Sequence, residues 1–269
     1  MGLRISLVSY LNAAPLGWFF LHGPMRHQFQ VIRDTPAQCA ARLARGEVDI
    51  GLIPTIEYQR IPNLMVIPGV GVAATNEVRS VLLVRPHESR VIRSVALDTS
   101  SRTSVVLVKL LLQHRMGLRP EFVPHEPKVY DMLRKCDAAL VIGDVALRCS
   151  PEEFQITDLA AAWHEWQERP FVFAFWACRP EALSSENQAE IFLEAKNWGL
   201  ARIEEIAASF SRTLDLPVAF LEGYLRRNLD HDMGPEHNEG LNRFYRLAFE
   251  AGLITELIPI RFLAGRMSR

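Results

Sequence analysis

Short apolar runs alternate with helical patterns along the first two thirds of the chain. Residues 3–8 and 48–53 are typical of buried strands, and residues 36–46 form a helical pattern that begins with proline and ends at Gly46. A strand, a helix and a strand in this order predict a βαβ unit with parallel strands. Further strands are predicted over residues 64–67, 79–84, 95–98, 122–123, 136–144 and 170–177.

The last third of the chain is predicted to be mainly helical. Amphipathic patterns follow Ser184, start again near Leu216, and run from residue 236 to 251. Residues 228–233 contain an aspartate, a histidine and a second aspartate in close succession. We interpret this segment as a solvated helix end rather than as a metal site.

A cluster of hydroxyl residues lies between the apolar run 95–97 and the helical pattern that starts near residue 103. The first turn of a helix has unpaired backbone N–H groups and a partial positive charge, so such a junction can hold an anion. Capping needs only one hydroxyl, whereas this loop has five in six positions. We therefore interpret it as ligand-facing, with capping and surface polarity as the alternative. The five residues are Thr99, Ser100, Ser101, Thr103 and Ser104.

Polar residues also follow other predicted strands. In an open α/β sheet, loops at the carboxyl ends of strands line the ligand crevice. Tyr10 and Asn12 lie after the first strand, Thr55 after the strand 48–53, and Asp144 after the strand 136–144. Turn formation is the alternative role for Asn12, and helix capping is the alternative for Asp144.

The composition is that of a globular protein of one large or two modest domains. The chain has 269 residues, 49% of them hydrophobic, and a formal net charge of −1, which gives no electrostatic footprint for nucleic acid or for a membrane surface. No apolar run reaches the 18 residues or so that a membrane span needs. The first strand pattern begins at Leu3 and leaves no room for a signal peptide, so we expect a cytoplasmic location.

The cysteine and histidine residues give no metal-binding pattern. The four cysteines lie far apart without a C-x-x-C motif, so we expect reduced thiols. The eight histidines are equally scattered, and no ligand set such as H-E-x-x-H is present. We predict no metal and no cofactor.

The element order predicts an α/β fold of two lobes joined by a double crossover hinge. We place lobe 1 at residues 1–86 plus 175–269 and lobe 2 at residues 87–174. Hydroxyl-rich strand ends from both lobes would face a cleft, and such clefts bind small molecules and close by a hinge. At this level a binding protein and an enzyme have the same pattern.

Five motifs in order resemble a known enzyme family. They are SYLN at residues 9–12, DIGLIPTIEY at 49–58, RSV at 79–81, ALDTSSRTS at 96–104 and GDVAL at 143–147. From about residue 4 to 260 the chain resembles the chorismate dehydratases of the futalosine route to menaquinone, whose fold is like that of type II periplasmic binding proteins. The related 1,4-dihydroxy-6-naphthoate synthases open with a Ser-Pro-Cys-Pro-Asn-like segment instead of SYLN, which favours the dehydratase.

The resemblance implies a cofactor-free loss of water from chorismate, giving 3-[(1-carboxyvinyl)oxy]benzoate. It implies catalytic roles for Asn12 and Ser80, with hydrogen bonds to the reacting ring and its hydroxyl. The sequence does not settle whether Arg79 and Arg102 contact the substrate or neighbouring acids. Substrate-binding roles are expected for Tyr10, Thr55, Ser100, Ser101, Thr103, Ser104 and Asp144.

A general base is harder to assign, because Asn and Ser are poor bases. Asp98, Glu57 and Asp144 are acids within the motifs, but each has a possible structural role. We hypothesise that the enolpyruvyl carboxylate of chorismate takes the proton itself, while the protein supplies the geometry.

Two other functions stay open at this stage. A non-catalytic small-anion binding protein would have the same fold, although it would normally be exported or lipidated. A naphthoate synthase-like enzyme would need a well-placed base in the cleft, and none of the eight histidines lies in a motif that can be placed there. A ligand-sensing regulatory domain is disfavoured by the balanced charge and the lack of a DNA-binding segment.

Overall fold

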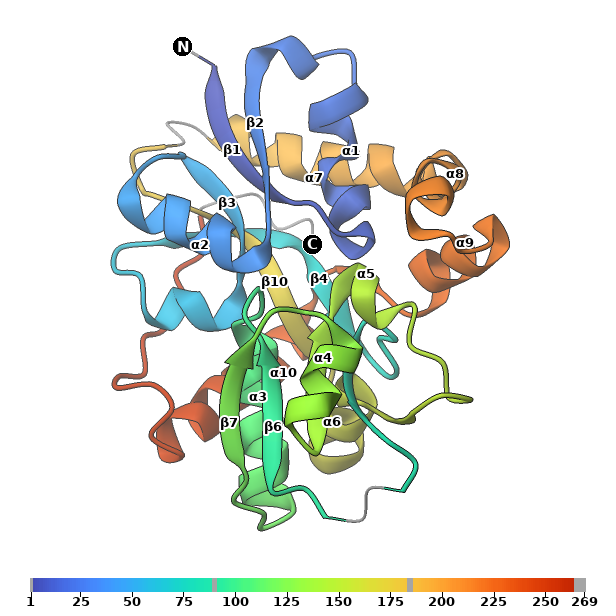
Figure 1. Ribbon diagram of the computed structural model, residues 1–269. Helices are drawn as coiled ribbons and strands as arrows, with labels where there is room; N and C mark the ends of the chain where they lie inside the picture. Colours follow the sequence, from blue (N-terminus) through green and yellow to red (C-terminus); the bar gives the residue numbers. More distant parts are fainter. Residues whose placement is uncertain (1, 89–90, 183–185, 264–269) are drawn as a thin grey trace.

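The computed structural model describes residues 2–88, 91–182 and 186–263, which form two α/β lobes, each built on one mixed sheet (Figure 1). The first sheet has the order β11-β4-β10-β3-β1-β2 and consists of β1 (Leu3–Val8), β2 (Phe29–Asp34), β3 (Ile50–Pro54), β4 (Met65–Ala74), β10 (Phe171–Cys178) and β11 (Asp230–Asp232). The second has the order β7-β6-β8-β5-β9 and consists of β5 (Val81–Arg85), β6 (Ser94–Asp98), β7 (Glu121–His125), β8 (Ala138–Ile142) and β9 (Gln155–Asp158).

Helices cover both sheets. Those that follow strands of the first sheet are α1 (Ala14–His22), α2 (Pro36–Arg45), α7 (Glu186–Leu200), α8 (Ile203–Leu214), α9 (Val218–Arg227) and α10 (Pro235–Glu250). Those of the second lobe are α3 (Thr103–Leu110), α4 (Val129–Lys135), α5 (Gly143–Ala146) and α6 (Leu159–Gln167). Helix α10 packs against both β10 and α3, so the C-terminal part of the chain contacts both lobes.

The predicted βαβ unit is present, and its local signals explain its bounds. Helix α2 begins after Thr35, which forms a capping box with Gln38, and it ends at Gly46 with φ 72°. Strand β1 lies between β2 and β3 and is parallel to both. In the second sheet β6 lies parallel to β7 and β8. The carboxyl ends of these strands therefore carry the segments that were predicted to face a cleft.

The lobe bounds differ from the expected ones at both crossings. Strand β5 was expected in lobe 1, but it pairs with β8 and β9 in the second sheet. Strand β10 pairs with β4 from Phe171 and with β3 from Ala174, so it belongs to the first sheet from residue 171. The chain thus crosses at residues 75–80 and 168–170 rather than near 86 and 174. An apolar run reveals a strand, but not which sheet it pairs with.

The prediction for residues 228–233 was also wrong, because this segment forms β11 instead of a solvated helix end. Its neighbour β4 runs from Met65 to Ala74 and is thus longer than the strand predicted over residues 64–67. The pairing of β11 with β4 has a register irregularity between Asp230 and Asp232. That irregularity is centred on His231, which is buried.

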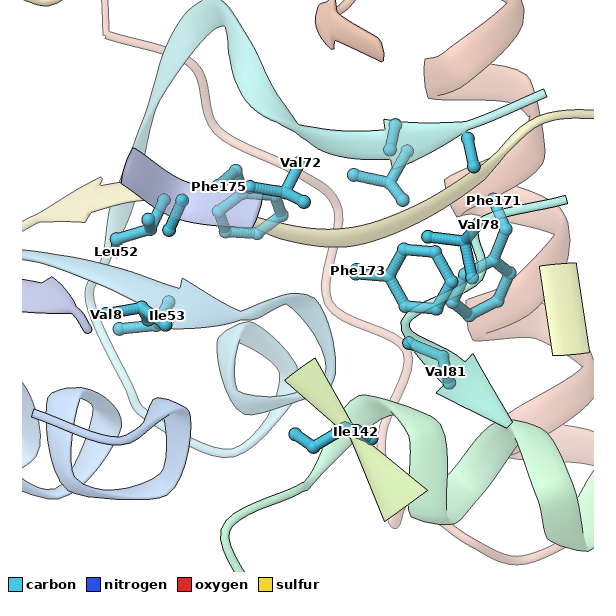
Figure 2. Close-up of a cluster of buried hydrophobic side chains, with 14 of the residues drawn as sticks. Val8, Leu52, Ile53, Val72, Val78, Val81, Ile142, Phe171, Phe173 and Phe175 are labelled. Atoms are coloured by element: carbon cyan, nitrogen blue, oxygen red, sulfur yellow. The ribbon is translucent and has the colours of Figure 1, made fainter. Parts of the chain in front are cut away.

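One hydrophobic core runs through both lobes. Strand β5 shows the connection, because Val81 and Leu83 belong to this shared core while Leu82 and Val84 face a smaller core on the other side of the second sheet. Figure 2 shows Val81 and Ile142 of the second lobe near Phe173 of the first. No helix within the described ranges is long and apolar enough to cross a membrane.

Candidate active site

A small, partly open cavity lies between the two lobes where the strand ends meet. Its polar lining comes from Tyr10 and Asn12 of the first lobe and from the loop before α3 in the second. Most of its apolar lining comes from strands β1, β3, β4, β5, β8 and β10. The residues are Val8, Tyr10, Asn12, Ala13, Pro36, Leu52, Pro54, Val72, Val81, Ser101, Arg102, Thr103, Ser104, Ile142, Gly143, Phe173 and Ala174.

The lobes are closed around this cavity. Its interior offers about 50 Å³ to water-sized molecules, enough for a few waters but small beside the several hundred Å³ of a typical small-molecule pocket. A ligand with a six-membered ring therefore needs the lobes to separate in order to enter. The two chain crossings at residues 75–80 and 168–170 are the places where such a hinge motion would occur.

The N-terminus of α3 supplies hydrogen-bond donors to the cavity. In any helix the N–H groups of the first turn have no intrahelical acceptor. In α3 the N-cap residue is Arg102, whose side chain does not cap them either, so they are available to a ligand. Thr103 and Ser104, the first two helical residues, line the cavity together with Ser101. Hydroxyls and N–H groups around a positive helix end favour a carboxylate.

Asp98 fixes the shape of this loop. Its Oδ1 accepts hydrogen bonds from the backbone N of Ser100 (2.8 Å) and from the Ser100 hydroxyl (2.6 Å). Burial raises the pKa of Asp98, and the two bonds from Ser100 oppose this shift. Ser100 is thus occupied by the loop itself and does not line the cavity.

Asn12 presents the most distinctive polar atom of the site. It lies in a 3₁₀ turn, Leu11–Ala13, that connects β1 to α1. Its side-chain oxygen Oδ1 is buried and has no hydrogen-bond partner among the described residues. A buried oxygen without a partner costs about 1–3 kcal/mol. A ligand in the cavity that Asn12 lines would remove this cost.

Hydrogen bonds between hydroxyl residues join the two lobes beside the cavity. The Tyr10 hydroxyl donates to Ser100 Oγ at 2.9 Å, and burial, the largest effect, raises the pKa of Tyr10 to about 12, so this donor keeps its proton. Thr55 Oγ1 lies 3.3 Å from Thr103 Oγ1, which also accepts from the backbone N of Ile56 at 3.2 Å. Thr55 itself does not line the cavity. These hydroxyls stabilise the closed arrangement.

Asp144 forms another bond between the lobes. Its Oδ1 accepts from the backbone N of Leu11 at 2.9 Å, next to Asn12. The N-cap position of α5 is occupied by Ile142, so the alternative role of Asp144 as a helix cap is wrong. Burial raises the pKa of Asp144 to about 6, while the bond from Leu11 and the charge of Arg148 oppose the shift.

We expect Asp144→Asn to stabilise the protein, and only above about pH 5. A carboxyl whose pKa is raised on folding favours the folded state below its unfolded pKa near 4, and this contribution is lost as the pH rises through about 6. The neutral amide can still accept from Leu11 and avoids that loss. Urea unfolding should show a difference below about 1 kcal/mol at pH 4 and of about 3 kcal/mol at pH 8. A difference that is the same at both pH values would contradict this interpretation.

Ser80 lies behind the cavity rather than in its lining. It is fully buried at the first chain crossing, and its Oγ accepts a hydrogen bond of 2.7 Å from the Tyr224 hydroxyl of α9. Its carbonyl oxygen accepts from the backbone N of Gly143 at 2.8 Å. Ser80 therefore links the hinge segment to Gly143, which lines the cavity.

The two arginines of the motifs, Arg79 and Arg102, contact groups of the protein close to them. Arg102 lines the cavity, but its Nη1 donates to the carbonyl oxygens of Thr99 and Ser101, both at 3.0 Å. The Arg79 side chain is half exposed, and it lies near Phe220 and 3.9 Å from Glu77. In this closed form neither guanidinium is paired with an acid inside the cavity.

Of the residues expected from the sequence to be catalytic or substrate-binding, five line the cavity, namely Tyr10, Asn12, Ser101, Thr103 and Ser104. The other four, Thr55, Ser80, Ser100 and Asp144, do not line it. Sequence reasoning missed the apolar lining, because residues such as Phe173 look like ordinary core positions within a strand. It also missed His231 and Tyr224, which contact site residues from far along the chain. Within the described ranges, no three His, Cys, Asp or Glu residues form a group that could hold a metal ion.

The chain is similar to known proteins in both sequence and fold. A family model described as menaquinone biosynthesis matches residues 3–250. A chorismate dehydratase from Thermus thermophilus is 33% identical over 244 residues, covering 82% of this chain and 86% of the relative. A crystal structure of an Archaeoglobus fulgidus protein matches with a TM-score of 0.76 and 17% identity, covering 94% of this chain and 98% of that one. The aliphatic sulphonate binding protein of Escherichia coli matches with a TM-score of 0.67 and 15% identity, covering 100% and 95%. The periplasmic-binding-protein-like fold class is thus confirmed.

Proposed function

Because the chain belongs to the menaquinone biosynthesis family, we propose that it is a chorismate dehydratase, a carbon–oxygen lyase that converts chorismate to 3-[(1-carboxyvinyl)oxy]benzoate and water. The observation that carries the proposal is the combination of hydrogen-bond donors with one unpaired acceptor at the cavity. The α3 N-terminus and the hydroxyls of Ser101 and Ser104 suit a carboxylate, and the Asn12 amide oxygen has no partner in the protein. Apolar residues across the cavity suit the face of a six-membered ring.

The chemistry of this elimination matches such a site. The proton that is lost sits on the ring carbon that bears the enolpyruvyl ether. A double bond connects that carbon to the ring carboxylate, so proton loss places negative charge on the carboxylate. Hydroxide then leaves, the ring becomes aromatic, and the proton and hydroxide together make up the released water.

We assign the growing carboxylate charge to the donors of the α3 N-terminus. A preorganised donor of this kind lowers a barrier by about 3 kcal/mol, because it is strongest when the charge has developed. Asn12 would bind at the reacting ring and its hydroxyl. Ser80 would support the site from behind the lining. Its carbonyl oxygen accepts from the backbone N of Gly143, which lines the cavity, and its Oγ accepts from the Tyr224 hydroxyl.

The residues that line the cavity also bear on which group acts as the general base. It contains no Asp, Glu or His residue among those described. Asp98 accepts from Ser100, Glu57 pairs with Arg60 at 2.7 Å, and Asp144 accepts from Leu11. We therefore assign the proton transfer to the enolpyruvyl carboxylate of the substrate, which the closed lobes would hold next to its own ring.

We expect that replacing each of these three acids by its amide slows catalysis without abolishing it. Asp98→Asn, Glu57→Gln and Asp144→Asn should each lower kcat by less than about 10³-fold, since none of them takes the proton. Steady-state rates with chorismate, together with substrate affinity from titration calorimetry, check this. A larger loss of kcat with affinity retained, in any one variant, would identify a conventional base.

The experiment that tests the function is a direct assay of the purified, metal-stripped protein with chorismate. Mass spectrometry should detect a product lighter by one water, and the ultraviolet spectrum should become that of a substituted benzoate, without an added cofactor. Unchanged chorismate in the presence of folded protein would overturn the proposal and favour a naphthoate synthase-like enzyme or a small-anion binding protein. The expected cytoplasmic location stays a prediction.

A further inference from the structure

A buried histidine contacts the backbone of Asn12 from a distant part of the chain. His231 of β11 is 3% exposed, and its Nε2 lies 2.9 Å from the carbonyl oxygen of Asn12. A carbonyl oxygen can only accept, so Nε2 is the donor. Burial lowers the pKa of His231, which favours the neutral ring with its proton on that nitrogen.

The turn that carries Asn12 needs this donor because of the sequence that follows it. In a 3₁₀ turn a carbonyl accepts from the N–H three residues later, and for Asn12 that residue is Pro15, which has no N–H. The neighbouring backbone group, the N of Leu11, is fixed by Asp144. Asp144 and His231 thus hold two peptide groups of the same turn, at Leu11 and at Asn12.

The strand that presents His231 is itself anchored at both flanking residues. Asp230 accepts from Thr75 Oγ1 at 2.8 Å and pairs with His237 at 3.4 Å, while Asp232 pairs with the buried Lys196 of α7. The register irregularity of β11 lies between these two aspartates. Such irregularities redirect side chains, and here the histidine is directed at the turn of Asn12.

From this arrangement we propose that His231 is a positioning residue for Asn12. The Asn12 side-chain oxygen has no protein partner, so no hydrogen bond to that oxygen holds the amide, and its place in the cavity depends on the backbone of the turn. The Nε2 hydrogen bond from His231 fixes that backbone, and the amide reaches the reacting ring only when the bond is present. The expected effect on kcat rests on the proposed dehydratase function. The placement of Asn12 by His231 rests on the geometry alone.

The test compares His231→Leu, His231→Gln and His231→Asn in chorismate turnover. Leucine removes the donor, so kcat should fall about 10- to 100-fold, because a displacement of about 1 Å has a cost of this order. Glutamine places an N–H near the position of Nε2 and should restore kcat to within about 5-fold, whereas the shorter asparagine should not. KM for chorismate should change much less than kcat, because the carboxylate donors of α3 are untouched.

A matched control and a double variant separate positioning from stability. His237→Leu removes the partner of Asp230 on the same strand without a contact to Asn12, so it should lower Tm while kcat stays within about 3-fold of wild type. In an Asn12→Ala background, His231→Leu should lower kcat by less than about 3-fold more, since it acts through the missing amide. Equal losses with and without Asn12, or wild-type kcat in His231→Leu, would overturn the inference.

A failure of the proposed function would be distinguishable from a failure of this inference. If the wild-type protein does not convert chorismate, the dehydratase proposal falls, and crystal structures of His231→Leu and His231→Gln then test the placement directly. The Asn12 amide should be displaced in the first and stay in place in the second. An undisplaced amide in His231→Leu would reject the positioning role whatever the substrate is.

Discussion

Asn12→Ala should lower kcat by about 10²–10³-fold, which is the size of loss seen when a preorganised hydrogen-bonding group is removed from a polar active site. The side-chain oxygen of Asn12 is buried without a protein partner and borders the cavity, so the truncation breaks no hydrogen bond of that atom in the free protein. Rates with saturating chorismate measure the loss. The Tm should stay the same or rise slightly, because a buried polar atom without a partner is removed.

The companion variant Asn12→Gln keeps the amide but moves it by one methylene. It should lose nearly as much activity as Asn12→Ala, since the site depends on where the amide lies rather than on its chemistry alone. Asn242→Ala, at an exposed position of α10 outside both chain crossings, is the control for general effects of removing an asparagine. If Asn12→Ala keeps more than about a fifth of the wild-type kcat, Asn12 is not part of the reacting site.

Gly143→Ala should lower kcat/KM by about 10²-fold or more by preventing full closure of the lobes. Gly143 has φ 61°, and a Cβ atom there would lie 2.5 Å from Cδ2 of the Tyr10 ring in the other lobe. The ring has to move away, which also disturbs the hydrogen bond from Tyr10 to Ser100 and the neighbouring turn of Asn12. Small-angle scattering with chorismate bound should show a more open particle than the wild type.

Gly117→Ala is a close control for the backbone part of this effect. Gly117 has φ 67°, but a Cβ atom there would meet nothing within 4 Å. Both variants should lose about 1 kcal/mol of stability, because alanine disfavours a left-handed backbone. Only Gly143→Ala should lose activity. Equal kcat/KM in the two variants would show that the contact between Gly143 and Tyr10 does not limit closure.

The local elements and the polar part of the site followed from sequence because their signals are local. The proline, the capping pair and the final glycine of α2 lie within a dozen residues, and each favours the same helix. The hydroxyl loop before α3 is likewise a continuous stretch, so its donors could be assigned before the cavity was seen. Asn12 could be assigned only through the resemblance to a family, since an asparagine after a strand is equally typical of a turn.

The sequence by itself determined the α/β class, the two-lobed arrangement, the hydroxyl loop and, through its motifs, the family. Only the tertiary structure decided that β5 pairs in the second sheet, that Ser80, Ser100 and Thr55 lie behind the cavity, and that His231 and Tyr224 contact site residues. The physical reason is that helix caps and strand patterns depend on neighbours in sequence. Strand pairing and the partner of a buried polar atom depend on which distant segments share a core. The residues around Asn12 therefore do not indicate that its carbonyl oxygen accepts a hydrogen bond from His231.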